Sequence, residues 1–193
     1  MNVSSSLYEF AFRGFLAEEG LDRAGRIHRN LVGSLDEEYA QRLGIELLDD
    51  QFVSSARQMA MVYMAITAFE NSVRKLIKTV LLEQKGEDWW NLSVSEKIRT
   101  RAEQKRQDEE KVRWHSPRGA DPIYYSLMGD LSSIIRQNWQ EFEPYMPSAE
   151  WAASILDVIE RSRNVIMHSG ALDKRDVERV GIYIRDWVKQ VGA

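Results

Sequence analysis

The sequence predicts an all-α protein, and three observations carry that prediction. The chain is rich in Ala, Leu, Glu, Gln, Lys, Arg and Met, and no run of alternating apolar residues suggests a strand. All four prolines fall between residues 117 and 147, so the flanking segments are free of the strongest helix breaker. Repeats of about 20–50 residues are not visible. We expect a helical bundle of four to five main helices in residues 35–193, after a helical N-terminal extension in residues 1–34.

The longest expected helix runs from about residue 54 to residue 84. Along it, residues of one row recur in alternating steps of four and three, the spacing of a helix that packs against partners. The row consists of Met59, Tyr63, Ile66, Glu70, Val73, Ile77 and Val80. Glu70 is an acid in an otherwise mostly apolar row, which makes it a candidate for a specific role.

A loop and a charged helix are expected next. Asp88-Trp89-Trp90 is interpreted as a loop, and Ser93 with Glu96 matches the capping box that starts a helix. That helix extends to about residue 111 and is almost entirely charged, as is typical of a solvated face. The tryptophans of this region are expected in the core, since aromatic residues of small helical domains are more often core than base-stacking platforms.

Three further helices complete the expected bundle. The first covers about residues 123–139, with a break near Gly129. Ser148 is a suitable N-cap for the second, which is expected to end at about His168 before Gly170. Asp173 is placed to cap the last helix.

Composition narrows the chemistry and the location. The chain contains no cysteine, which excludes disulfides and thiolate chemistry. Its three histidines, at positions 28, 115 and 168, have no second histidine within one helical turn, so no metal and no cofactor are expected. The N-terminus lacks a basic segment before its first apolar stretch, and the apolar run at 59–69 is too short to cross a bilayer. We therefore expect a cytoplasmic protein without a membrane association.

The net charge of −4 is unevenly distributed. Residues 1–50 hold five Arg and ten acids, whereas residues 51–193 hold 21 bases and 20 acids. A nonspecific nucleic-acid binder usually shows a basic excess, so overall charge gives no support for nucleic-acid binding. Any such function must come from a local site.

The most informative helix is the one that ends at His168. One of its rows contains Ala152, Leu156, Ile159, Arg163 and Ile166, so Arg163 interrupts a core-facing row. A guanidinium in apolar surroundings needs a partner or a ligand. One interpretation is an ion pair with Glu70 that only holds two helices in register. The other is a site in which Arg163 binds a phosphate and His168 transfers protons, which suits metal-free phosphodiester cleavage.

The amino-acid sequence around these residues resembles that of a known family. Arg163-Asn164-Val165-Ile166-Met167-His168 resembles the R-N-x-x-x-H signature of the HEPN superfamily, and the longer string is similar to its Swt1-type branch. The other stretches that carry the resemblance are Phe69-Glu70-Asn71 with Arg74, Asp88-Trp89-Trp90, Trp114-His115, residues 121–125, 129–131 and 134–136, Asn138-Trp139 and Arg161-Ser162. The resemblance covers about residues 35–190.

The resemblance implies a fold and an activity. HEPN domains are helical bundles that usually dimerise, with the two Arg-to-His motifs in a cleft at the interface. Many are metal-independent endoribonucleases of toxin–antitoxin, phage-defence or RNA-processing systems. Carried onto this chain, Arg163 and His168 are catalytic and Asn164 supports them. The implied reaction is attack of a ribose 2′-hydroxyl on the adjacent phosphate. The implied partners are RNA, a second copy of the chain, and an antitoxin or regulatory protein.

Four residues are weaker candidates for a supporting role. Glu70 would orient Arg163, and Arg74 fits the first long helix of the family. His115 and Arg118 lie in a loop and are either ordinary loop residues or substrate contacts. Residues 97–118 hold eight bases against four acids and would guide an RNA backbone. Because some HEPN domains lack activity, the alternative is an inactive module for dimerisation, partner binding or nucleotide binding.

Overall fold

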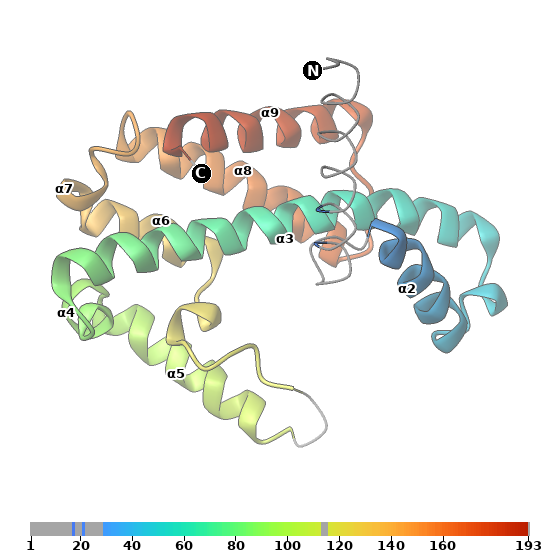
Figure 1. The fold of residues 1–193 in the computed structure, drawn as a ribbon, viewed down its shortest axis with the longest axis horizontal. Coiled ribbons are helices and arrows are strands. Elements are labelled where there is room, and N and C mark those ends of the chain that lie inside the picture. Colours follow the sequence, from blue (N-terminus) through green and yellow to red (C-terminus); the bar gives the residue numbers. More distant parts are fainter. Residues whose placement is uncertain (1–16, 18–20, 22–28, 113–115, 193) are drawn as a thin grey trace, which may run out of the picture. The chain divides into compact units, whose positions relative to one another are not determined.

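A computed structural model of the protein describes residues 17, 21, 29–112 and 116–192, and every regular element among them is helical (Figure 1). The chain divides into two compact units after Val53. The first unit contains α2 (Arg29–Arg42) and the short 3-10 helix η1 (Ile45–Leu47). The predicted extension at 1–34 lies mostly outside the described residues. Within the described part of the chain, no helix is long and apolar enough to span a membrane.

The second unit confirms the predicted all-α bundle. Five of its helices have ten residues or more, and the longest is α3 (Asp50–Lys85). The buried side of α3 follows the predicted row except at Tyr63, which is exposed while Val62 and Phe69 are buried. A straight helix has 3.6 residues per turn, so a strict seven-residue pattern drifts around it and the buried stripe shifts by one position.

The prediction of a loop at residues 88–90 is wrong in part, because Trp89 begins the short helix α4 (Trp89–Ser93). This turn buries the Trp89 ring, and Trp90 packs edge-on against it at 5.5 Å between ring centroids. Trp90 and Trp139 pack against the core from partly buried positions, as predicted. Helix α5 (Glu96–Glu110) starts after Ser95 rather than Ser93, which is buried at the end of α4.

The predicted helix over 123–139 is three elements instead of one. They are η2 (Pro122–Tyr125), α6 (Met128–Gln137) and α7 (Trp139–Phe142). The first interruption lies at Ser126 and Leu127, which are extended, and not at Gly129, and the second lies at Asn138. The Asp130 carboxylate accepts the Leu127 N–H at 2.9 Å, so a new helix starts at Met128, one residue before the predicted break.

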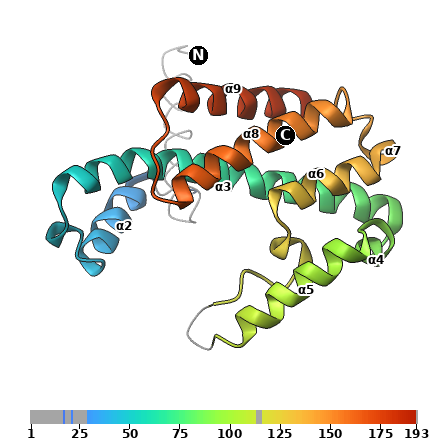
Figure 2. The same cartoon turned by 180° about the vertical axis from the view of Figure 1, so that it is seen from behind.

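Helices α8 (Ala149–Met167) and α9 (Lys174–Val191) begin at the predicted caps. Ser148 Oγ accepts the Trp151 N–H at 3.0 Å, and the Asp173 carboxylate accepts the Asp176 N–H at 2.8 Å. The two helices run antiparallel beside α3 (Figures 1 and 2). Helix α6 packs on α8, while α5 packs on η2.

Three aromatic rings join α3, α8 and α9. The Trp187 ring of α9 stacks on Trp151 of α8 at 5.6 Å and meets Phe69 of α3 edge-on at 5.5 Å. Trp187 is fully buried, so its contacts hold α9 against the other two helices.

Replacing this ring tests how α9 is held. Trp187→Ala is expected to lower the free energy of unfolding by about 3–5 kcal/mol, because the helices cannot close over the lost volume. Ile182→Ala on the same helix is the control, since Ile182 is largely exposed and its loss is expected to cost less than about 1 kcal/mol. Urea denaturation measures both, and equal losses would contradict this packing.

Candidate functional site

The candidate site begins at the C-terminal end of α8, where the chain leaves the helix through a left-handed residue. His168 is the C-cap, and Ser169 has φ 61°. The Ser169 N–H donates to Ile166 O at 3.0 Å and the Gly170 N–H donates to Val165 O at 2.8 Å. These two bonds form a Schellman motif that satisfies the last carbonyls of the helix. A Cβ at Gly170 would lie 2.8 Å from Val165 O, so this exit requires glycine.

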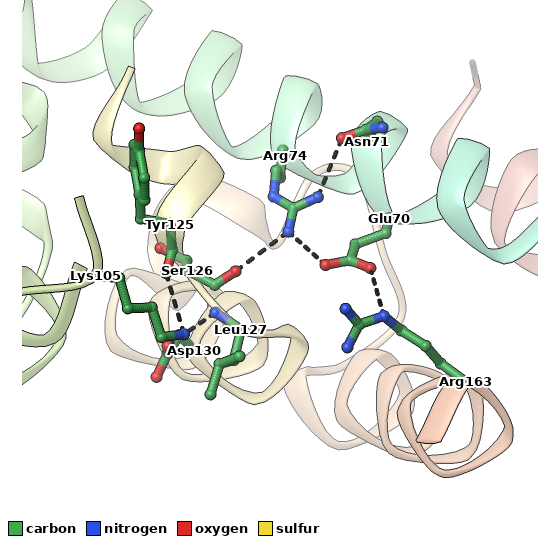
Figure 3. Close-up of polar contacts among 9 residues, drawn as sticks. All are labelled: Glu70, Asn71, Arg74, Lys105, Tyr125, Ser126, Leu127, Asp130 and Arg163. Atoms are coloured by element: carbon green, nitrogen blue, oxygen red, sulfur yellow. Dashed lines mark hydrogen bonds and ion pairs between the residues drawn. The ribbon is translucent and has the colours of Figure 1, made fainter. Parts of the chain in front are cut away.

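Arg163 lies five residues before His168 and turns toward α3. Its Nε lies 3.5 Å from Glu70 Oε2, which forms the ion pair that the sequence left open (Figure 3). The Glu70 side chain is 8% exposed and that of Arg163 is 27% exposed. The ion pair is made through Nε, and among the described residues the terminal Nη atoms of Arg163 form no hydrogen bond, so they remain available to a ligand.

Arg74 shares the same carboxylate from the other side. Its guanidinium donates to Glu70 Oε1, to Asn71 Oδ1 at 3.0 Å and to Ser126 O at 3.1 Å (Figure 3). Glu70 therefore lies between two guanidiniums, one from its own helix and one from α8. Within the described residues, Arg74 Nε and Ser126 Oγ are buried without a partner, so the polar cluster is not fully satisfied.

Not all of the predicted site residues contact one another in the structure. Asn164 and His168 have exposed side chains, and neither side chain has a polar partner among the described residues. Arg118 Nε pairs with Glu109 Oε1 at 2.5 Å instead of Arg163 or Glu70. His115 lies outside the described residues. The part of the chain that is described contains no cluster of three or more metal-ligating side chains.

Arg101 and Lys105 entered the sequence analysis only as members of the basic stretch 97–118, and neither of them, nor Asp130, was singled out as a site residue. Arg101 of α5 pairs with Asp130 of α6 at 3.1 Å, and Lys105 of α5 donates to Tyr125 O at 3.4 Å. Burial lowers the pKa of Lys105, and the positive charges of Arg118, Arg101 and Arg163 lower it further, against the opposing effect of Asp130. Asp130 could have been recognised from the sequence, because it is an acid in an apolar segment. Lys105 could not, since nearly every residue of its helix is charged.

These features define a class of protein: an all-α bundle with a buried carboxylate beside a helix that carries an arginine-to-histidine motif at its end. The chain belongs to the Swt1-like HEPN family, whose model matches residues 64–192. This confirms the resemblance seen in the sequence and the HEPN helical bundle. The HEPN family is generally associated with ribonucleases. Comparison with curated proteins gave no match, and comparison with solved structures gave none either.

The sharing of the Glu70 carboxylate by two arginines predicts how substitutions change the stability of the fold. Glu70→Ala is expected to lower the free energy of unfolding by about 3 kcal/mol, because it leaves the buried Arg74 guanidinium without its carboxylate. Arg163→Met is expected to cost only about 1 kcal/mol, since Arg163 is partly exposed and Glu70 keeps Arg74. Chemical denaturation of the two variants measures the difference. If Arg163→Met loses more free energy of unfolding than Glu70→Ala, the account is contradicted, because Arg163 would then be the main partner that stabilises the Glu70 carboxylate.

Proposed function

We propose that the protein is a metal-independent endoribonuclease, and that its reaction is attack of a ribose 2′-hydroxyl on the adjacent phosphodiester. The observation that carries this proposal is the way in which the Arg163 side chain is bound. Glu70 holds Arg163 through Nε while its Nη atoms have no partner among the described residues, five residues before an exposed His168. A fixed fork of donors beside an exposed imidazole fits a reacting phosphate.

Arg163 has the role of stabilising charge. When the 2′-oxygen bonds to phosphorus, negative charge builds up on the non-bridging phosphate oxygens. The Nη donors of Arg163 would bind those oxygens, and the ion pair with Glu70 limits the reorientation that binding requires. Glu70 and Arg74 are therefore positioning residues in this proposal, and Asn164 supports the exposed end of the helix.

His168 has the role of moving protons. The reaction forms the O2′–P bond and breaks the P–O5′ bond, so one proton leaves the 2′-hydroxyl and one is delivered to the 5′-oxygen. An imidazole serves either step in the physiological pH range. The products are a 2′,3′-cyclic phosphate and a free 5′-hydroxyl. A homodimer with its motifs at the interface would supply one imidazole for each transfer.

The biological setting in this proposal is that of an RNA-cleaving effector in a toxin, phage-defence or RNA-processing system, controlled by an antitoxin or regulatory protein. It follows from family membership together with the Arg163–His168 arrangement. The basic stretch of residues 97–118 supports an RNA substrate, because it adds cations beside Arg163.

Cleavage of total cellular RNA in the presence of EDTA tests the proposal. His168→Ala is expected to lower the cleavage rate by about 100-fold or more, the usual contribution of a general acid or base. Arg163→Ala is expected to lower it by about 100-fold to 1,000-fold through lost charge stabilisation. Wild-type products are expected to end in a cyclic phosphate, which end mapping identifies.

Arg161→Ala is the matched control, because Arg161 is exposed on the same helix and pairs only with Asp157 among the described residues. It is expected to cleave RNA at the wild-type rate. Folded wild-type dimers that cleave no RNA would overturn the proposal in favour of the inactive HEPN module. Equal cleavage by wild type, Arg163→Ala and His168→Ala would also contradict it, since the activity would then lie elsewhere.

A further inference from the structure

A second group of cations lies next to the Arg163 cluster, on α5 and the segment that follows it. Arg101 and Lys105 are one helical turn apart on α5, and Arg118 is tied to the same helix through Glu109. Figure 3 shows Lys105 and Arg163 in one close-up, with Ser126 and Leu127 drawn between their ribbons. The charge of Arg163 is close enough to lower the pKa of Lys105.

Among the residues paired here, cations outnumber carboxylates by one in each half of the cluster, and Glu160 of α8 is a further acid nearby, beside Gly129. In the first half, Arg74 and Arg163 share the single carboxylate of Glu70. In the second half, the cations Arg101, Lys105 and Arg118 face the carboxylates of Asp130 and Glu109. A partly buried excess of positive charge is unfavourable unless an anion neutralises it.

Lys105 is the cation that lacks its own carboxylate in the second half. Asp130 accepts from Arg101 and from the Leu127 N–H, and Glu109 pairs with Arg118. Among the described residues, the only hydrogen bond of Lys105 Nζ is the long one to Tyr125 O at 3.4 Å. Lys105 is thus a half-buried ammonium with one long hydrogen bond and three guanidiniums nearby, a setting that an anionic ligand would stabilise.

We propose that Lys105 binds a second phosphate of the RNA substrate, beside the phosphate held by Arg163. This inference rests on the proposed function and adds a second binding position to it. Each phosphodiester of an RNA strand carries one negative charge, so two neighbouring phosphates suit two neighbouring cations, Arg163 and Lys105. An ammonium suits this task because it acts as a point charge without the bidentate geometry needed at the reacting phosphate.

A binding role and a structural role predict opposite effects on stability. Neutralising Lys105 removes repulsion from three guanidiniums, so Lys105→Met is expected to melt at or above the wild-type temperature. Methionine keeps most of the aliphatic length, which limits any packing change. If Lys105 only supported the fold, the same variant would melt at a lower temperature.

The experiment measures binding of a single-stranded 2′-O-methyl RNA oligonucleotide, which has no 2′-hydroxyl to attack. The dissociation constant is measured at several salt concentrations for wild type, Lys105→Met and Lys105→Arg. Each phosphate contact contributes about 0.7 to the slope of log affinity against log salt for a single strand. Lys105→Met is expected to lose about 0.7 of this slope, and Lys105→Arg is expected to retain it.

Lys85→Met is the matched control, because Lys85 lies outside residues 97–118, at the end of α3, and pairs with Glu141 at 2.6 Å. It is expected to keep the wild-type slope. If Lys105→Met keeps the wild-type slope while the wild-type protein cleaves RNA, the role of Lys105 is overturned and the proposed function stands. A wild type that neither binds the oligonucleotide nor cleaves RNA would overturn the proposed function as well. A lower melting temperature in Lys105→Met together with an unchanged slope would identify a structural lysine.

Discussion

The site depends on one buried carboxylate. Glu70 is held between Arg74 of its own helix and Arg163 of α8, so a single acid fixes two guanidiniums and links two helices. A buried carboxylate without such partners would be strongly disfavoured, and the same holds for the buried Arg74 without Glu70. The ion pair is therefore compatible with both interpretations of the sequence: it joins two helices, and it also orients Arg163 through Nε while leaving the rest of its fork accessible.

The other half of the site is set by how α8 ends. Ser169 in a left-handed conformation and Gly170 against Val165 O stop the helix directly after His168. This ending places His168 at the C-cap with an exposed side chain, whereas Arg163, five residues earlier, remains partly buried. The arrangement separates a partly buried, ion-paired cation from an exposed imidazole. Within our proposal this suits a reaction in which charge stabilisation needs a fixed donor and proton transfer needs access to substrate.

Periodicity and the residues preferred at helix caps predicted much of this arrangement. Arg163 and Glu70 each interrupted an apolar row, and the structure pairs them; Ser148 and Asp173 cap the helices that they were expected to cap. These features depend on residues close in sequence or on a regular repeat. The identification of the family rested on a longer string of residues, since an arginine a few positions before a histidine is common by chance.

The features that the sequence did not predict depend on contacts between distant segments, except for one local helix cap. The break at Ser126 and Leu127 follows from Asp130, whose carboxylate caps the backbone instead of continuing the helix. The bond from Arg74 to Ser126 O joins positions 52 residues apart, and no local pattern encodes it. Lys105 differs from the other lysines of its charged segment only through its surroundings, because burial and three neighbouring guanidiniums set its environment.

Side-chain nitrogen NMR of Arg163 tests the central claim most directly. The signals are assigned by their loss in Arg163→Ala, and the wild type is then saturated with a 2′-O-methyl RNA oligonucleotide. Our account predicts that the Nη signals shift on binding while the Nε signal stays near its free position, because Glu70 continues to hold Nε. Saturation that leaves every Arg163 signal unchanged would contradict a phosphate-binding role for this residue.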